Sequence, residues 1–156
     1  MQRTKACNIR KATYDDILDI AYLGKKFAKE SQNSGLGWSQ EKVFNSLHDA
    51  VQRDDFLILV MEKDDEVVGF FAGLVTPCFF SDVKQAVDLA WFVHKDHRGS
   101  REALGMIDLY EEWAKESGAV VVNMINLDVL NGDKVRKMYE KRGYRLVENT
   151  FAKELN

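Results

Sequence analysis

The chain has 156 residues, enough for one domain with a hydrophobic core and too few for two comfortable ones. A formal net charge of −3 argues against a broad electrostatic surface for nucleic acid. No apolar run approaches the roughly 18 residues that a membrane-spanning helix needs. We therefore expect residues 1–156 to form a single globular domain without nucleic-acid or membrane partners.

Cysteine and histidine positions argue against a disulfide or a metal centre. Cys7 and Cys78 lie far apart in the sequence and lack the paired spacing of a disulfide framework or zinc site. His94 and His97 have H-x-x-H spacing around Asp96, but this turn offers no fourth ligand. We therefore expect a protein without bound metal. Because the first residues also lack an apolar signal region, we expect it to be cytoplasmic.

The N-terminal third predicts a strand followed by two helices. Residues 6–12 alternate as a short strand, and Thr13 with Asp16 three positions later resembles a capping box that starts a helix ending near Glu30. A loop rich in Ser, Asn and Gly follows. Ser39 then caps a second helix. These helices and their loop are expected to form one wall of a cleft.

The next segments predict an antiparallel hairpin of residues 56–61 and 67–75. Gly69 and Gly73 within its second strand indicate a bulge or the close approach of another backbone. The loop of residues 77–84 carries Phe79 and Phe80. With Trp38, these aromatics would either line a pocket or cover the end of the sheet.

The central stretch, residues 87–118, has the pattern of a strand, a polar turn and an amphipathic helix. Gly118 is placed to end the helix with a left-handed cap, and residues 119–122 read as a second buried strand. This order predicts a right-handed parallel crossover. The expected buried face of the helix has i, i+3, i+4 spacing and consists of Ala103, Met106, Ile107, Tyr110, Trp113 and Ala114.

A last helix, residues 134–142, is expected to end at Gly143. Residues 144–147 and 150–152 then read as a closing hairpin. The predicted fold class is α/β, an α+β mixed sheet with a parallel pair, flanked by about four helices.

Two motifs on these elements resemble the GNAT superfamily of acyl-CoA-dependent N-acetyltransferases. The family's pyrophosphate loop, Q/R-x-x-G-x-G/A, is matched at its first and last positions by Arg98 and Ala103. Arg101 stands where the pattern has its first glycine, and Lys95 where proline is usual. In the first helical turn, Arg101 would keep its N–H group and add a guanidinium for phosphate.

The second motif, N-x-x-A-x-x-x-Y-x-x-x-G-F/Y, is similar to the segment from Asn131 to Tyr144. The spacing from Tyr139 to Gly143 and the aromatic Tyr144 fit it. The resemblance implies a splayed parallel pair of strands that holds the acyl-CoA arm. The residues implied to bind acetyl-CoA are Phe92 and Val93 through their backbone, Arg98, Gly99, Ser100, Arg101, Glu102 and Ala103 at the pyrophosphate, and Asn131 at the arm.

The resemblance also suggests catalytic roles for Tyr139 and Asp88. A phenol near the thioester sulfur would protonate the leaving thiolate, which makes Tyr139 the general acid. Asp88 is our candidate for the group that receives the proton of the amine. Without the resemblance, Tyr139 would read as a core residue. For Asp88 the alternative to a base is a solvated or loop-pairing carboxylate.

The predicted function is N-acetyltransfer from acetyl-CoA to a primary amine by direct attack in a ternary complex. The acceptor would be a small-molecule amine or a protein or peptide amine, and a homodimer is plausible. The alternative is a catalytically weak GNAT-like module that binds acyl-CoA or a protein partner. A scaffold that binds no CoA is the third possibility.

Overall fold

The computed structural model describes residues 7–31, 36–127 and 130–155 of the chain, and its elements follow the predicted order as far as the last helix. The strands are β1 Asn8–Lys11, β2 Phe56–Lys63, β3 Glu66–Pro77, β4 Lys84–Val93 and β5 Ala119–Asn123. The helices are α1 Ile17–Glu30, α2 Gln40–Ala50, α3 Arg101–Glu116 and α4 Gly132–Lys141.

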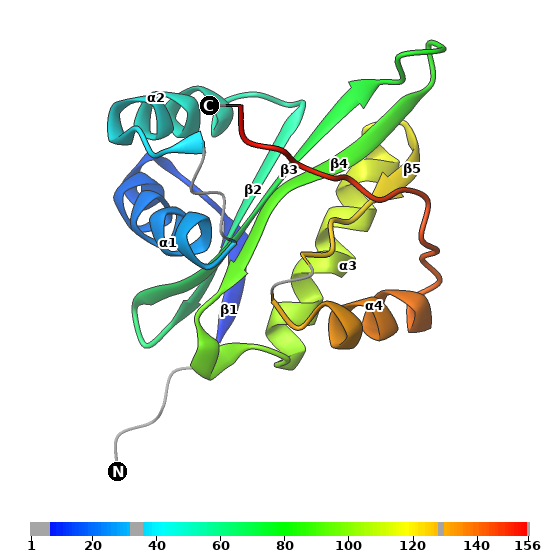
Figure 1. Cartoon of the computed structure of the whole chain (residues 1–156). Coiled ribbons are helices and arrows are strands. Elements are labelled where there is room, and N and C mark those ends of the chain that lie inside the picture. Colours follow the sequence, from blue (N-terminus) through cyan, green and yellow to red (C-terminus); the bar gives the residue numbers. More distant parts are fainter. Residues whose placement is uncertain (1–6, 32–35, 128–129, 156) are drawn as a thin grey trace.

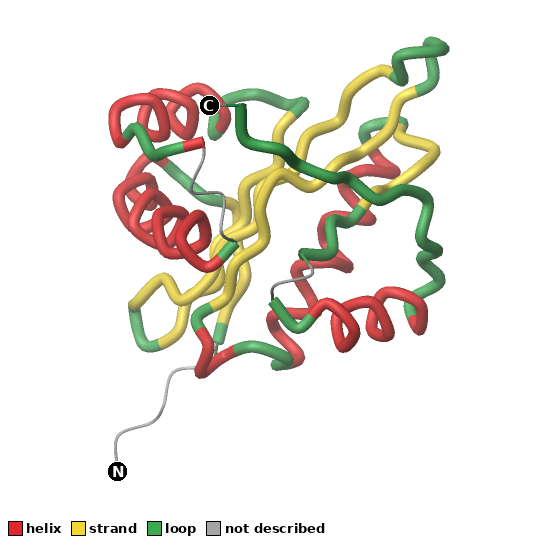
Figure 2. Tube along the Cα trace, in the orientation of Figure 1, coloured by secondary structure: helices red, strands yellow, loops and turns green. Residues whose placement is uncertain are grey.

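The five strands form one mixed sheet in the order β1-β2-β3-β4-β5. All neighbouring strands are antiparallel except β4 and β5, which are parallel and joined through α3. Helices α1 and α2 cover one face of the sheet, and α3 and α4 lie on the other (Figures 1 and 2). The predicted mixed sheet with a parallel crossover is therefore confirmed.

Each face of the sheet has its own hydrophobic core. On the α3 face, Met106 and Tyr110 are completely buried against Met61 and Phe71 of the sheet. On the opposite face, Ile20 and Leu23 of α1 belong to a cluster with Phe70 and Phe92. Of the six residues predicted to face inward on α3, five are buried and Trp113 is partly buried. Within the described parts of the chain, no helix is both long and apolar enough to cross a membrane.

The predicted helix starts are confirmed by their hydrogen bonds. The Thr13 N–H donates to the Asp16 carboxylate at 2.7 Å, where a 3-10 turn leads into α1. The Ser39 hydroxyl accepts from the Lys42 N–H at 3.2 Å. The Asp16 carboxylate also accepts hydrogen bonds from both terminal nitrogens of Arg10, at 2.7 and 2.8 Å. This ion pair holds the pKa of the Asp16 carboxyl below its usual value. The start of α1 is thereby tied to β1.

The hairpin strands are irregular near both glycines, as predicted. The register of β2 and β3 shifts between Met61 and Glu62, opposite the stretch that contains Gly69. The register of β3 and β4 shifts at Gly73, because Gly73 pairs with Asp88 while the preceding Ala72 pairs with Ala90. Leu89 is therefore an extra residue in β4. A bulge of this kind bends its strand and redirects the neighbouring side chains.

Replacing Gly73 with alanine should destabilise the fold by about 1–3 kcal/mol, because the added methyl overpacks the core. A Cβ atom at this position would lie 2.9 Å from the Tyr110 ring and 3.0 Å from the Phe71 ring. Gly105→Ala is the matched control, since its Cβ would meet only the flexible end of Ile9 at 3.2 Å. Because Gly105 lies within α3, alanine there should also favour the helix, by up to about 1 kcal/mol relative to glycine. Urea unfolding of both variants checks this; equal stabilities would contradict it.

Two expectations for the C-terminal part are wrong. Strand β5 is not buried, because Val120 and Val121 are 69% and 51% exposed at the edge of the described sheet. The closing hairpin is absent from the described residues: 144–155 form no strand, and Leu146 and Val147 are exposed. A short two-stranded hairpin is marginal by itself, and these runs do not pair with β5.

Candidate active site

The site lies where β4 and β5 separate. Their parallel pairing runs from Lys84 with Ala119 to Val87 with Asn123, and no pair follows. Beyond this point the β5 side of β4 has no strand neighbour among the described residues. The predicted splayed pair is therefore present, and it opens at Asp88, next to the bulge.

Asp88 is a buried carboxylate at this opening. Its side chain is 5% exposed. Both carboxylate oxygens accept from the Ile125 N–H at 3.0 Å, so Asp88 bridges β4 to the segment that follows β5. Burial raises the pKa of Asp88 from 3.8 to about 6, although the hydrogen bonds from the Ile125 and Asp88 backbone act in the opposite direction. The carboxylate thus titrates close to neutral pH.

Tyr139 reaches the same residue from α4. Its hydroxyl donates to the carbonyl oxygen of Ile125 at 3.1 Å, and the side chain is 7% exposed. Burial raises the pKa of the Tyr139 phenol, and the negative charge of Asp88 raises it further. The phenol therefore keeps its proton at neutral pH.

The backbone of Ile125 brings the two predicted catalytic side chains together. Its N–H donates a hydrogen bond to Asp88, and its carbonyl accepts one from Tyr139. One group titrates near pH 6 and the other stays protonated, which is the separation that a base and an acid need in the same site. The arrangement has a proton acceptor and a proton donor beside an open strand edge.

The predicted pyrophosphate loop forms the start of α3. Gly99 has a φ of +72°, which suits glycine, and a Cβ atom added there would meet nothing within 4 Å. The Ser100 hydroxyl caps the helix by accepting from the Ala103 N–H at 3.2 Å. Arg101 is the first residue of α3 and has no positive φ, as expected for helical backbone. The N–H groups of Arg101 and Glu102 have no partner within the helix and suit an anion.

The Arg98 side chain folds back onto the protein. Its Nε donates to the Val93 carbonyl at 2.7 Å, and its Nη2 pairs with Glu30 at the end of α1 at 2.8 Å. The guanidinium also lies 5.3 Å from the centre of the Phe92 ring. In this conformation Arg98 links β4 to α1, and the exposed Arg101 is the cation at the first turn of α3.

The other residues implied by the family motifs differ in their surroundings. The Phe92 side chain is buried in the core on the α1 face, so its backbone is the part left for a ligand. Ala103 is buried below the first turn of α3. Asn131 is exposed with a left-handed backbone, φ 57°, just before α4, and its side chain does not cap that helix.

The structure adds polar residues that the sequence analysis missed. Asn126, next to Ile125, donates from Nδ2 to the Gly132 carbonyl at 3.0 Å. Trp91 packs against the α3-face core, yet its indole N–H is buried without a partner. Glu30 holds Arg98. No sequence signal marks these residues, because their surroundings depend on how the elements pack in three dimensions.

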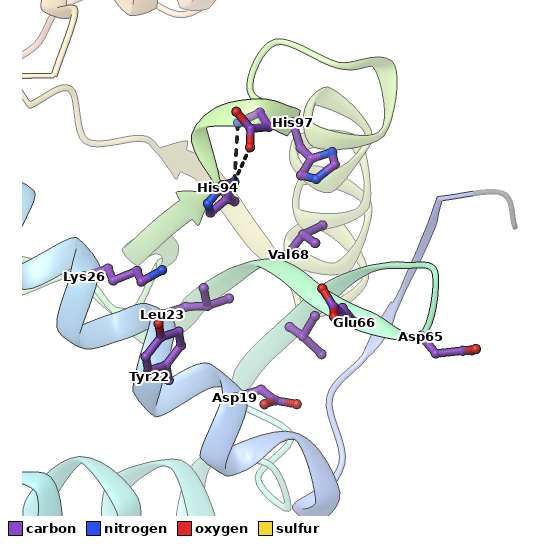
Figure 3. A pocket seen from close by; sticks show the side chains of 11 residues that line it. Asp19, Tyr22, Leu23, Lys26, Asp65, Glu66, Val68, His94 and His97 are labelled. Carbon is purple, nitrogen blue, oxygen red and sulfur yellow. Dashed lines mark hydrogen bonds and ion pairs between the residues drawn. The ribbon is translucent and has the colours of Figure 1, made fainter. Parts of the chain in front are cut away.

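A polar cleft of about 570 Å³ lies elsewhere, between α1, the β2–β3 turn and the turn after β4 (Figure 3). His94 Nδ1 lies 3.4 Å from the Asp96 carboxylate, and the rings of His94 and His97 are 6.1 Å apart. In the described ranges no three His, Cys, Asp or Glu side chains are grouped to hold a metal ion. The cleft contains neither Asp88 nor Tyr139, so we place the candidate chemistry at the opening between the strands.

Comparison with known proteins identifies the family and the fold. Residues 21–144 match the family described as the acetyltransferase (GNAT) family. A protein from Clostridium acetobutylicum, described as a predicted acetyltransferase with acetyl-CoA, has a TM-score of 0.73 at 18% identity, covering 97% of this chain and 96% of that one. None of the curated proteins matches the chain in sequence.

Other solved structures with the same fold act on different acceptors. Ribosomal-protein-alanine N-acetyltransferase from Brucella melitensis biovar Abortus 2308 has a TM-score of 0.68 at 20% identity, covering 96% of this chain and 100% of that one. Glucosamine-6-phosphate N-acetyltransferase from Arabidopsis thaliana has a TM-score of 0.69 at 16% identity, with 97% and 100% covered. At these identities the likeness shows the fold alone. Because the family match spans most of the chain, this protein belongs to the GNAT acetyltransferase family.

Proposed function

We propose that the protein is an N-acetyltransferase that moves the acetyl group of acetyl-CoA to a primary amine by direct attack in a ternary complex. The observation that carries this proposal is the placement of Asp88 and Tyr139 on the two polar groups of Ile125, at the opening between β4 and β5. The family uses acetyl-CoA, and a protein with this fold was solved with it.

The residues around the opening fit acetyl-CoA. The first turn of α3 offers the N–H groups of Arg101 and Glu102 and the guanidinium of Arg101 to the pyrophosphate. Gly99 leaves open space beside that turn. The free edge of β4 around Phe92 can form backbone hydrogen bonds with an extended ligand, in the way that it would pair with an additional strand. These features support a pyrophosphate on the turn and an arm directed toward Asp88.

The proposed chemistry assigns one proton transfer to each side chain. As the amine nitrogen bonds to the acetyl carbon, Asp88 accepts the proton that the nitrogen loses, directly or through a water molecule. As the carbon–sulfur bond breaks, Tyr139 donates its hydroxyl proton to the leaving thiolate. Proton exchange with solvent then restores both side chains. The products are an N-acetylated amine and CoA.

The acceptor is proposed to be a primary amine on a small molecule or on a peptide. The relatives with this fold include enzymes named for a sugar phosphate and for a ribosomal protein, so the fold accommodates both classes. Phe79 and Phe80 do not cover the sheet, since they are 92% and 89% exposed at the tip of the β3–β4 loop. Exposed aromatics of this kind are available for contact with a partner molecule.

Calorimetric titration with acetyl-CoA tests the cofactor assignment. We expect micromolar binding of acetyl-CoA and CoA, and weaker binding of 3′-dephospho-CoA if the 3′-phosphate is contacted. Arg101→Ala should weaken acetyl-CoA binding about three- to tenfold, because a charge-assisted contact to phosphate is lost. Arg145→Ala is the control, since Arg145 is exposed in the segment after α4. No binding at millimolar acetyl-CoA would contradict the assignment.

A further inference from the structure

Arg98 joins two elements that lie far apart in the sequence. It belongs to the turn between β4 and α3, and its Nη2 donates to Glu30, the last residue of α1, at 2.8 Å. Its Nε donates to the Val93 carbonyl at 2.7 Å. The His94 N–H is bonded to Val68 of β3, and a planar peptide directs the Val93 carbonyl the opposite way, toward the free edge of β4. The guanidinium therefore closes the end of that edge and ties it to α1.

These two hydrogen bonds leave the guanidinium without a free pair of donors. An arginine binds a phosphate most strongly through two parallel N–H bonds, from Nε and one Nη nitrogen or from both Nη nitrogens. Each such pair contains a nitrogen of Arg98 that already donates to Val93 or to Glu30. Nη1 has no hydrogen-bond partner in the described parts of the chain. A phosphate that uses Nη1 and Nη2 would displace Glu30 and leave the Nε bond to Val93 in place.

The bond to Glu30 is the one that an anion can replace. The side chains of Arg98 and Glu30 are 41% and 39% exposed, and an exposed ion pair contributes little to stability because water competes for both charges. Arg98 precedes Arg101, the first residue of α3, by at most about 11 Å of chain. That first turn is where the pyrophosphate is proposed. The anion and the Glu30 carboxylate therefore compete for one guanidinium.

We propose that Glu30 is a latch on the anion-binding turn. Its carboxylate holds Arg98 until a phosphate group takes its place, and ligand binding at the turn then frees the end of α1. This inference rests on the proposed function, since acetyl-CoA is the ligand that brings the pyrophosphate. It makes Glu30 a positioning residue that acts through Arg98. It also couples the turn before α3 to α1, which covers the opposite face of the sheet (Figure 1).

Calorimetric titration with acetyl-CoA tests the latch. Glu30→Gln removes the carboxylate charge and keeps the length of the side chain. We expect it to bind acetyl-CoA about three- to fivefold more tightly than the wild type, because no ion pair has to be broken. In an Arg98→Ala background the same substitution should change the affinity by less than about twofold, since Glu30 then has no guanidinium to hold.

Hydrogen exchange followed by NMR gives a second measurement that does not depend on activity. At the end of α1, the Ser31 N–H donates to the Phe27 carbonyl at 2.9 Å. Acetyl-CoA should speed the exchange of this amide in the wild type, because the end of α1 loses its tie to the turn. It should slow exchange in the first turn of α3. In Glu30→Gln the Ser31 amide should exchange fast with and without the ligand.

The matched control is Glu140→Gln, which breaks another exposed ion pair, to Arg136 at 2.9 Å on α4. This variant should bind acetyl-CoA as the wild type does. Unchanged or weaker binding by Glu30→Gln would overturn the inference. An equal gain in affinity with and without Arg98 would overturn it too, because it would indicate a general effect of charge. Failure of the wild-type protein to bind acetyl-CoA would instead remove the proposed function beneath it.

Discussion

Replacing Asp88 with asparagine is expected to lower kcat/KM for acetyl transfer about a hundredfold at pH 8, because the variant has no side chain at the opening to accept the amine proton. The wild-type rate should fall as the pH drops through about 6, where Asp88 takes up a proton. This part of the pH–rate profile should be missing in Asp88→Asn. Steady-state kinetics between pH 5 and 9 checks both effects. A variant rate within threefold of the wild type would exclude Asp88 as the base.

The same substitution should increase stability at high pH. The pKa of Asp88 is higher in the folded protein than its ordinary value of 3.8, so the protonated form favours folding. This contribution is complete below pH 3.8 and is lost as the pH rises through about 6, which amounts to about 3 kcal/mol. Asparagine is neutral at every pH and can still accept from the Ile125 N–H.

Asp88→Asn should therefore be more stable than the wild type at pH 8, by up to about 3 kcal/mol, and the difference should shrink toward pH 4. Urea unfolding of both proteins at the two pH values measures it. Greater stability with lower activity would separate a catalytic carboxylate from a structural one. Lower stability at pH 8 would show that the Asp88 bridge to Ile125 supports the fold.

Replacing Tyr139 with phenylalanine should lower kcat at least tenfold with little change in acetyl-CoA affinity. The substitution removes the proton for the leaving thiolate and keeps the ring, which packs 5.5 Å from the Tyr144 ring. The Ile125 carbonyl also loses its hydrogen bond from the hydroxyl. Turnover and calorimetric binding measured on the same preparation give the two quantities.

Tyr144→Phe is the matched control for this prediction. The Tyr144 hydroxyl donates to Glu111 at 2.8 Å, outside the pair of contacts to Ile125. Burial raises the pKa of the Tyr144 phenol as it does for Tyr139, so the two tyrosines differ chiefly in position. We expect Tyr144→Phe to keep most of the wild-type turnover. Equal losses in the two variants would point to packing of α4 instead of proton transfer.

The sequence pattern predicted most of the fold because its signals are local. Helical spacing identified the inner face of α3, and Gly118, at φ +84°, ends that helix region as expected. The glycines of β3 marked the bulged region. The closing hairpin was predicted wrongly, since the alternation of its short runs says nothing about whether a neighbouring strand is available to pair with them.

The candidate site could be predicted only in part. Motif spacing indicated Tyr139, whereas no motif indicated Asp88 as the proton acceptor. The structure brings the two side chains together. The environment of Asp88 depends on the Leu89 bulge and on the separation of β4 from β5, which are tertiary features. The pairing of Arg98 with Glu30 joins residues 68 positions apart in the sequence. The burial of the Trp91 and Asn126 side-chain atoms without a partner depends on how the elements pack around them. No residue pattern in one segment reports such contacts.

Acetyl transfer is tested by incubating the purified protein with acetyl-CoA and a mixture of primary amines and peptides, then identifying the products by mass spectrometry. We expect N-acetylated product and free CoA in equal amounts, both strongly reduced in Tyr139→Phe and Asp88→Asn. Release of CoA without acetylated amine would indicate hydrolysis. Tight binding of acetyl-CoA with no acetylated product from any amine would contradict the account and favour a binding module.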